Sequence, residues 1–329
     1  MNFSIFAPPS QDRPMMALLL ILTGVLFLAL QDSLVKVVSP ETSFWQFQTI
    51  RSSMNLILIL VMARMTLGIG ILRPINPKAV FMRAIMLALC MTFFFGAAPQ
   101  ISVTQMAAGL YTYPLFITAM AGPVLGEKIG PWRLGALALG AMGSMTVLNP
   151  FNEAFQWVQI MPIIAGFFYA CNVMILRKYC RQESPLCLTF IVAVVFLVFG
   201  SSGAAVMAAL PLSDEFRATV PFVFNAWPEL TLLVVAFCGL ASLLNLTGNI
   251  CLSRAYQTAD SSWLAPLDFS YLLFVTLWSK LLFGTLPTPS AALGMAMIAA
   301  AGVITAIREG YNQRKRKKDA DQTASIGPL

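Results

Sequence analysis

Asp32, Arg51 and Asp268 are charged residues that lie within long apolar segments of the sequence. A charge inside a bilayer is costly, so an ionisable side chain placed there is a candidate for binding a solute or a proton. At the helical rise, Asp32 lies ~8 Å from the end of its segment and Arg51 ~10 Å into the next one. We expect this pair to interact or to face one cavity. The alternative is that Asp32 pairs with Lys36, one turn later, as a structural clamp.

Asp268 follows Pro266 by two residues, within the ninth apolar segment. Proline removes a backbone hydrogen bond one turn earlier, so the helix can open at this point. A carboxyl group beside such an opening favours the binding of substrate or the exchange of protons. The alternative is a structural ion pair with a cation near the inner surface, such as Arg83.

Aromatic and amide side chains are further candidates for the same site. Aromatic faces hold planar or cationic ligands. However, Trp and Tyr also anchor helices at the membrane interface, and Asn within a membrane helix often hydrogen-bonds a neighbouring helix. The candidates are Tyr111, Tyr113, Trp263, Tyr271, Asn172, Asn245 and Asn249.

Two of the apolar segments contain similar sequences, TQMAAGLYTYPLF at 104–116 and YQTADSSWLAPLDF at 256–269. We expect the proline of each copy to break its helix. Phe116 occupies the position equivalent to Asp268, so only the second copy carries the charge. The residues that recur, at an offset of 152 (257 − 105), are Gln105, Ala107 and Pro114 in the first copy and Gln257, Ala259 and Pro266 in the second.

The composition indicates an all-α integral membrane protein. The 329 residues are 58% hydrophobic and 11% charged, whereas a soluble chain carries about 25% charged residues. A membrane-spanning helix needs ~20 mainly apolar residues. Ten such helices are predicted, at 15–37, 44–66, 79–98, 104–125, 132–149, 158–176, 186–209, 230–252, 261–283 and 290–307.

The distribution of basic residues predicts the orientation. Most Lys and Arg residues fall on the side of the membrane that holds both termini, which the positive-inside rule places in the cytoplasm. The basic run 314–318 is expected to touch anionic lipid, and no nucleic-acid binding is predicted. The chain has no histidine, and its six cysteines lack metal-like spacing. We therefore predict structural thiols, no metal and no cofactor.

The chain divides into two halves of five predicted spans each. Because five is odd, the second half crosses the membrane in the opposite direction, giving an inverted repeat around a central cavity. Small residues in the fifth and tenth spans allow close helix packing, either within one chain or in a homodimer. The predicted domains are a tail at 1–13, a first repeat at 14–149, a second repeat at 157–307 and a basic, disordered tail at 308–329.

Several segments, taken in their order and spacing, are typical of one family. They are DSLVK at 32–36, Arg51, Arg83, GEKIGPWRLGALALGAMG at 126–143, RKYCRQES at 177–184 and SRAYQTADSSWLAPLDFSYLLF at 253–274. Along nearly its whole length, the chain resembles the EamA-type ten-span transporters of the drug/metabolite transporter superfamily. One departure is Thr285, where the family often has glutamate. The resemblance implies ten helices around a central cavity in the bacterial cytoplasmic (inner) membrane, through which small polar or amphipathic metabolites move.

The sequence thus predicts a secondary transporter and not an enzyme. It contains no P-loop and no nucleophile–base pair, which leaves a gradient-driven carrier or a facilitator. The predicted partners are the lipid bilayer, a small-molecule substrate (amino acid, nucleoside-like molecule, vitamin or drug) and, for a coupled carrier, protons. Uptake, efflux and exchange all fit, as do a monomer and a homodimer. The alternative from another class is a non-transporting membrane sensor or assembly partner.

Overall fold

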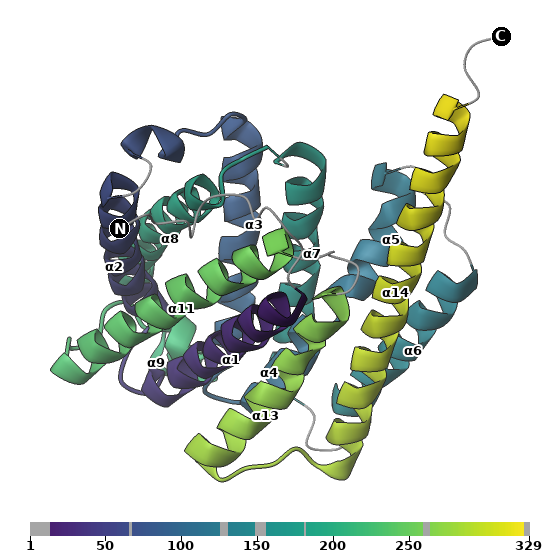
Figure 1. The fold of residues 1–329 in the computed structure, drawn as a ribbon. Coiled ribbons are helices and arrows are strands. Elements are labelled where there is room, and N and C mark those ends of the chain that lie inside the picture. Colours follow the sequence, from purple (N-terminus) through teal and green to yellow (C-terminus); the bar gives the residue numbers. More distant parts are fainter. Residues whose placement is uncertain are drawn as a thin grey trace.

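The computed structural model describes residues 14–65, 68–125, 131–148, 156–180, 182–258 and 264–325, and this part of the chain is helical without strands. Figure 1 shows the arrangement of its helices. The long helices are α1 (Pro14–Val38), α2 (Phe44–Met65), α3 (Pro77–Gly96), α6 (Pro131–Leu148), α7 (Met161–Tyr179), α8 (Pro185–Ala209), α11 (Leu232–Thr258) and α14 (Pro289–Ser325). The shorter ones are η2 (Ile69–Leu72), α4 (Val103–Leu110), α5 (Tyr113–Leu125), η3 (Trp157–Ile160), α9 (Asp214–Thr219), α10 (Pro221–Phe224), η4 (Ala265–Phe269) and α13 (Ser270–Phe283).

Six helical segments of the described chain are long and apolar enough to cross a membrane. They are Met15–Val38, Pro77–Gly96, Trp157–Tyr179, Pro185–Ala209, Leu232–Ala255 and Pro266–Phe283, and Leu134–Leu148 and Pro289–Thr305 are shorter apolar helices.

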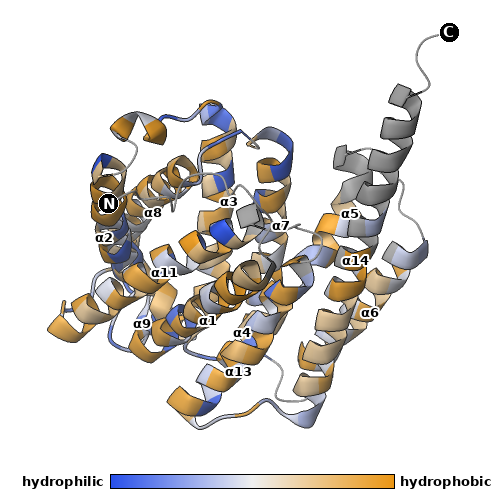
Figure 2. Cartoon of the chain, in the orientation of Figure 1, coloured by the Kyte–Doolittle hydropathy of each residue, from blue (hydrophilic) through white to orange (hydrophobic). Residues whose placement is uncertain are grey.

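Large apolar side chains are exposed on the outside of the helices. Leu232 is 85% exposed and Leu273 is 73% exposed. Figure 2 shows hydrophobic residues along much of α1 and α13. An apolar surface of this extent needs lipid rather than water around it. The chain is therefore a multi-pass membrane protein.

The long helices pack in close pairs, α1 with α11, α3 with α7, α2 with α8, and α6 with α14. Two of these pairs meet at glycines. A Cβ atom added at Gly143 would lie 2.8 Å from the carbonyl oxygen of Gly294, and one added at Gly24 would lie 2.9 Å from that of Gly248. In lipid, where the hydrophobic effect does not drive helices together, such close approach supplies the van der Waals contact that holds them.

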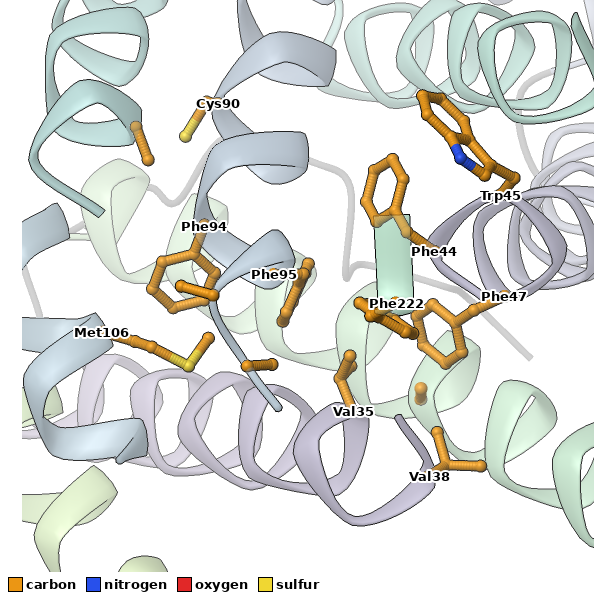
Figure 3. Close-up of a cluster of buried hydrophobic side chains, with 14 of the residues drawn as sticks. Val35, Val38, Phe44, Trp45, Phe47, Cys90, Phe94, Phe95, Met106 and Phe222 are labelled. Carbon is orange, nitrogen blue, oxygen red and sulfur yellow. The ribbon is translucent and has the colours of Figure 1, made fainter. Parts of the chain in front are cut away.

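A cluster of buried aromatic side chains, here called the aromatic cluster, lies where α1 and α3 end and α2 begins (Figure 3). Phe44, Phe95 and Phe222 are fully buried in it, and the rings of Phe44 and Phe222 meet edge-on with centroids 6.1 Å apart. Phe222 belongs to α10, in the connection between α8 and α11. The Trp45 indole fixes this connection by donating to the backbone oxygen of Val223 at 2.5 Å.

The C-terminal segment differs from its prediction. The sequence predicts disorder from residue 308, whereas α14 continues as a helix to Ser325. The residues 308–325 are rich in Arg, Lys, Gln and Ala, which have high helix propensity. Extending an existing helix requires no new nucleation, so these polar residues continue the apolar helix that precedes them.

The contact between α6 and α14 gives a first testable prediction. We expect Gly143→Ala to destabilise the protein by about 1–3 kcal/mol, because the new methyl group would force the two helices apart. Gly135→Ala on the same helix is the matched control, since a Cβ atom there meets nothing within 4 Å. The melting temperatures of both purified variants in detergent measure the difference. An unchanged melting temperature for Gly143→Ala would contradict the close crossing.

Candidate functional site

A cavity of about 260 Å³ lies between α1, α2, α3, α7, α8, α11 and the segments around α4, α5, η4 and α13. It gathers most of the residues that the sequence singled out as candidates. Trp263 lies outside the described residues. Pro114 and Pro266 are not among the lining residues, but each lies within two residues of one, Tyr113 and Asp268 respectively. The predicted residues that line it are Asp32, Arg51, Tyr111, Tyr113, Asn172, Asn245, Asn249, Asp268 and Tyr271.

Two interrupted helices meet at this cavity. α4 ends at Leu110 and α5 begins at Tyr113, so the fourth predicted span is broken just before Pro114. The ninth contains the short 3-10 helix η4, which includes Pro266 and passes into α13 at Ser270. Because proline has no N–H to donate, each break leaves backbone oxygens that other groups can contact.

Tyr111 connects the two breaks. Its hydroxyl donates to the backbone oxygen of Asp268 over 3.0 Å. Its ring stacks on that of Tyr271, with centroids 5.1 Å apart and planes 13° from parallel, and Phe269 meets it edge-on at 5.4 Å. Tyr111 and Tyr271 thus form an aromatic surface in the cavity wall, of the kind that a planar ligand can extend.

Asp32 belongs to a chain of hydrogen bonds that crosses three helices. One carboxylate oxygen accepts from Gln31 Nε2 at 2.7 Å, and the other accepts from the Tyr271 hydroxyl at 2.5 Å. Gln31 Oε1 accepts in turn from Asn245 Nδ2 at 2.8 Å. The carboxylate is therefore fixed between α1 and α13 and connected to α11.

The ammonium group of Lys36, the alternative partner of Asp32, has other contacts. It donates to the backbone oxygens of Ala98 and Ile101, at 2.5 Å each. Lys36 thus ties the end of α1 to the connection between α3 and α4. The hydrogen bonds of Asp32, by contrast, are made to groups of the cavity wall.

Arg51 lies in the same cavity as Asp32 and is only 3% exposed. Its Nη2 donates to Gln48 Oε1 at 2.9 Å. The guanidinium carbon lies 5.4 Å from the centre of the Phe47 ring and 6.0 Å from that of Phe196. Contacts with one amide and two aromatic faces therefore hold this cation within the protein.

The cavity wall also contains residues that the sequence did not single out as site residues, among them Gln31, Tyr169 and Arg83. Arg83 has the same sequence signal as Arg51, a charge in an apolar segment, which could have identified it as a site residue. Tyr169 packs edge-on against Tyr113, with centroids 4.8 Å apart. Its sequence context does not distinguish it from a tyrosine that anchors a helix at the membrane interface.

A second, smaller cavity of about 140 Å³ adjoins the first and shares Thr189 and Asn249 with it. It lies between the start of α8 and the end of α11, where Ser253 is part of its wall. The aromatic cluster contains Val234, at the opposite end of α11. The main cavity is thus covered at one end by packed rings and continued at the other. No group of His, Cys, Asp and Glu in the described chain is suited to a metal ion.

The chain is similar in sequence to several proteins that are named as transporters. A riboflavin transporter of Rhizobium johnstonii is 27% identical over 91% of this chain and 93% of its own length. A riboflavin transporter of Vibrio cholerae is 29% identical over 61% of each chain. An S-adenosylmethionine uptake transporter of Rickettsia prowazekii is 24% identical over 70% of this chain and 72% of its own. No protein-family model matches the chain.

The fold has a counterpart among solved structures. A crystal structure that is 15% identical superposes with a TM-score of 0.56, covering 89% of this chain and 96% of the other. At this identity the likeness concerns the fold alone. Together with the named relatives, the helical membrane architecture identifies a transporter of small metabolites and not an enzyme.

The hydrogen bond between Tyr271 and Asp32 gives a second prediction. Tyr271→Phe removes the hydroxyl but keeps the ring that stacks on Tyr111. We expect substrate transport to fall about 10-fold, because a buried carboxylate oxygen loses its donor and the wall of the cavity loosens.

The control is Thr305→Val on α14, whose hydroxyl donates to the backbone oxygen of Ala301 on its own helix. Membrane levels and transport of both variants are measured side by side. If Tyr271→Phe transports as well as the control, the hydrogen bond has no role in transport.

Proposed function

We propose that this chain is a ten-span, inverted-repeat secondary transporter that moves a planar, vitamin-like metabolite by alternating access, with riboflavin as the first candidate. The observation that carries the proposal is the tyrosine-lined cavity at the meeting point of two broken helices. Relatives named riboflavin transporters support the choice of ligand. Binding sites near the midplane, formed by interrupted helices, are typical of carriers that alternate between two openings.

The pairing of helices supports the inverted repeat, with halves at 14–149 and 157–307. The first half contributes α1, α2, α3, the broken α4–α5 and α6, and the second contributes α7, α8, α11, the broken η4–α13 and α14. Exchanging the halves in this order converts the contact α1–α11 into α7–α3, and both contacts occur. The same exchange leaves the contacts α2–α8 and α6–α14 unchanged. A two-fold axis in the membrane plane would generate this set of contacts, which supports the proposed repeat.

The two ends of the cavity suggest the direction in which this conformation opens. By the positive-inside rule, we expect both termini, the start of α8 and the end of α11 to lie on the cytoplasmic side of the inner membrane. The second cavity then lies toward the cytoplasm, and the aromatic cluster lies toward the outside. We assign this conformation to the inward-facing half of the transport cycle, with Phe222 part of the outer closure.

The chemistry of the cavity suits a flat heterocycle with polar edges. The stacked rings of Tyr111 and Tyr271 offer a face for it, and the amides of Asn172 and Asn245 offer hydrogen bonds at its rim. The volume of about 260 Å³ is below the ~300–1,000 Å³ typical of sites for drug-sized ligands. We therefore expect the surrounding helices to separate when a flavin enters.

A second candidate ligand is S-adenosylmethionine, named for the Rickettsia relatives. The observation in its favour is that two carboxylates, Asp32 and Asp268, line the cavity together with tyrosine rings. Carboxylates and aromatic faces both attract a cationic sulfonium group. Riboflavin, which carries no charge on its ring system, gains less from the acids.

Uptake measurements test the proposed ligand directly. We expect expression of this chain to restore growth of a bacterial strain that cannot make riboflavin, at low external riboflavin, and to raise uptake of radiolabelled riboflavin above the background. Uptake of labelled S-adenosylmethionine is measured in the same cells. Membrane expression with no gain in riboflavin uptake contradicts the riboflavin assignment, and a gain for S-adenosylmethionine alone supports the second candidate.

Proton coupling through Asp268 is a separate prediction. If this carboxyl exchanges a proton during each cycle, transport by the natural chain depends on pH and transport by Asp268→Asn does not. Initial uptake rates at several pH values, in cells or proteoliposomes with an imposed pH gradient, measure this. The natural chain itself is the control, and retention of its full pH dependence by Asp268→Asn assigns the proton to another group.

A further inference from the structure

Two arginines line the same cavity, but their surroundings differ. Arg51 donates to Gln48 and lies between the rings of Phe47 and Phe196. Arg83 has buried Nε and Nη1 atoms with no hydrogen-bond partner in the described part of the chain. Unsatisfied buried donors are costly, and more so when they are charged. Arg51 Nε also lacks a hydrogen-bond partner in this part of the chain, but the Arg51 guanidinium has a bonded Nη2 and two aromatic faces, whereas two nitrogens of Arg83 still need acceptors.

Arg83 and Asn172 line the same cavity at a similar depth on two packed helices. α3 and α7 pack against each other. Arg83 lies six residues after the start of α3 (83 − 77) and Asn172 seven before the end of α7 (179 − 172), or ~9 and ~10 Å from the same side at the helical rise. Tyr169, one turn before Asn172, is close enough to interact electrostatically with Arg83. These three side chains therefore occupy one wall of the cavity.

Within the part of the chain that the structure describes, Asn172 has an acceptor atom without a donor, whereas Arg83 has donor atoms without an acceptor. Asn172 is only 3% exposed, and its Oδ1 has no donor among the described residues. The wall therefore offers unused N–H donors on Arg83 and an unused acceptor on Asn172. A ligand edge that satisfies both must present a carbonyl oxygen next to an N–H group.

We propose that Arg83 and Asn172 determine substrate specificity by binding the carbonyl-bearing, imide-type edge of a planar heterocycle. The guanidinium donates to a ring carbonyl oxygen, and Asn172 Oδ1 accepts from the neighbouring ring N–H. The opposite, apolar end of the ring then extends toward the stacked tyrosines. The inference rests on the proposed transport function and defines which edge of the ligand the protein recognises.

A role for Arg83 as a simple anchor in the lipid interface fits the structure less well. An arginine that reaches the interface keeps its charged head in water or among headgroups. Arg83 instead has two of its three guanidinium nitrogens buried, on a side chain that lines the cavity. Its charge is therefore directed into the protein.

The test compares riboflavin with two analogues that are altered at opposite edges of the ring system. Binding of riboflavin, of riboflavin methylated at the imide nitrogen, and of an analogue altered only on the benzenoid edge is measured by flavin fluorescence with purified protein. We expect the natural chain to bind the imide-methylated compound at least ~10-fold more weakly than riboflavin, because a buried acceptor is left unpaired. The analogue altered on the benzenoid edge keeps both hydrogen bonds and is therefore expected to bind more tightly than the imide-methylated compound.

The variants Arg83→Lys and Asn172→Leu assign the effect to residues. Each is expected to weaken riboflavin binding about 10-fold, since lysine lacks the planar fork of donors and leucine lacks the acceptor. Asn172→Leu should also remove the preference against the imide-methylated compound, which a purely structural role would not do. Arg73→Lys, at an exposed arginine outside the cavity, is the control and should bind all three compounds as the natural chain does.

The outcomes separate this inference from the proposed function. The inference is overturned if both variants bind riboflavin as the natural chain does. It is also overturned if the preference against imide methylation persists in Asn172→Leu. Neither outcome contradicts the proposed transport function. If the natural chain binds no riboflavin, the flavin assignment fails. Binding of uridine and of uridine methylated at its imide nitrogen then decides the inference alone, since loss of preference in Asn172→Leu supports it and equal or absent binding of the two compounds overturns it.

Discussion

The hydrogen bond from the Tyr111 hydroxyl to the backbone oxygen of Asp268 joins the two places where this chain stops being regular helix. Within a bilayer, each backbone group freed by a helix break must find a partner inside the protein. Here a residue at one break supplies the donor for the other, and its ring stacks on Tyr271 just beyond. The cavity depends on this arrangement, because continuous helices at both places would leave no irregular backbone to contact a ligand.

Charge imposes the second constraint. Asp32 and Arg51 lie in one cavity, yet each is satisfied mainly by neutral groups, Asp32 by Gln31 and Tyr271 and Arg51 by Gln48 and aromatic faces. Neutral partners position a charged group without neutralising its charge. The charge can therefore still attract a polar ligand in the cavity. The hydrogen-bond chain from Asn245 through Gln31 to Asp32 also connects α11 to α1. A movement of α11 would therefore shift the hydrogen bonds of the Asp32 carboxylate.

Outside the cavity, the helices pack in the way that a lipid solvent requires. Glycine contacts between α1 and α11, and between α6 and α14, allow backbones to approach where the hydrophobic effect gives no help. At one end of the bundle, the aromatic cluster closes the structure with side-chain donors that bind backbone oxygens, as Trp45 binds Val223. At the other end, the second cavity continues the first past Thr189 and Asn249. The two ends of the bundle therefore differ, which supports the inward-facing conformation proposed above.

The sequence by itself determined the all-helical membrane class and which residues are candidates. Apolar segments of membrane length, prolines in two similar segments and charges in apolar surroundings are local signals, and Asp32, Arg51, Asp268 and three tyrosines all line the cavity. The tertiary structure alone decided how these residues are satisfied. Asp32 contacts Tyr271, 239 residues away, and not Lys36 one turn later. Arg83 and Arg51 look alike in sequence, and only packing shows that Arg51 Nη2 is bonded to Gln48 whereas Arg83 Nε and Nη1 lack hydrogen-bond partners in the described chain. The physical reason is that the cost of a buried polar group depends on its neighbours in space, and local sequence does not specify which those are.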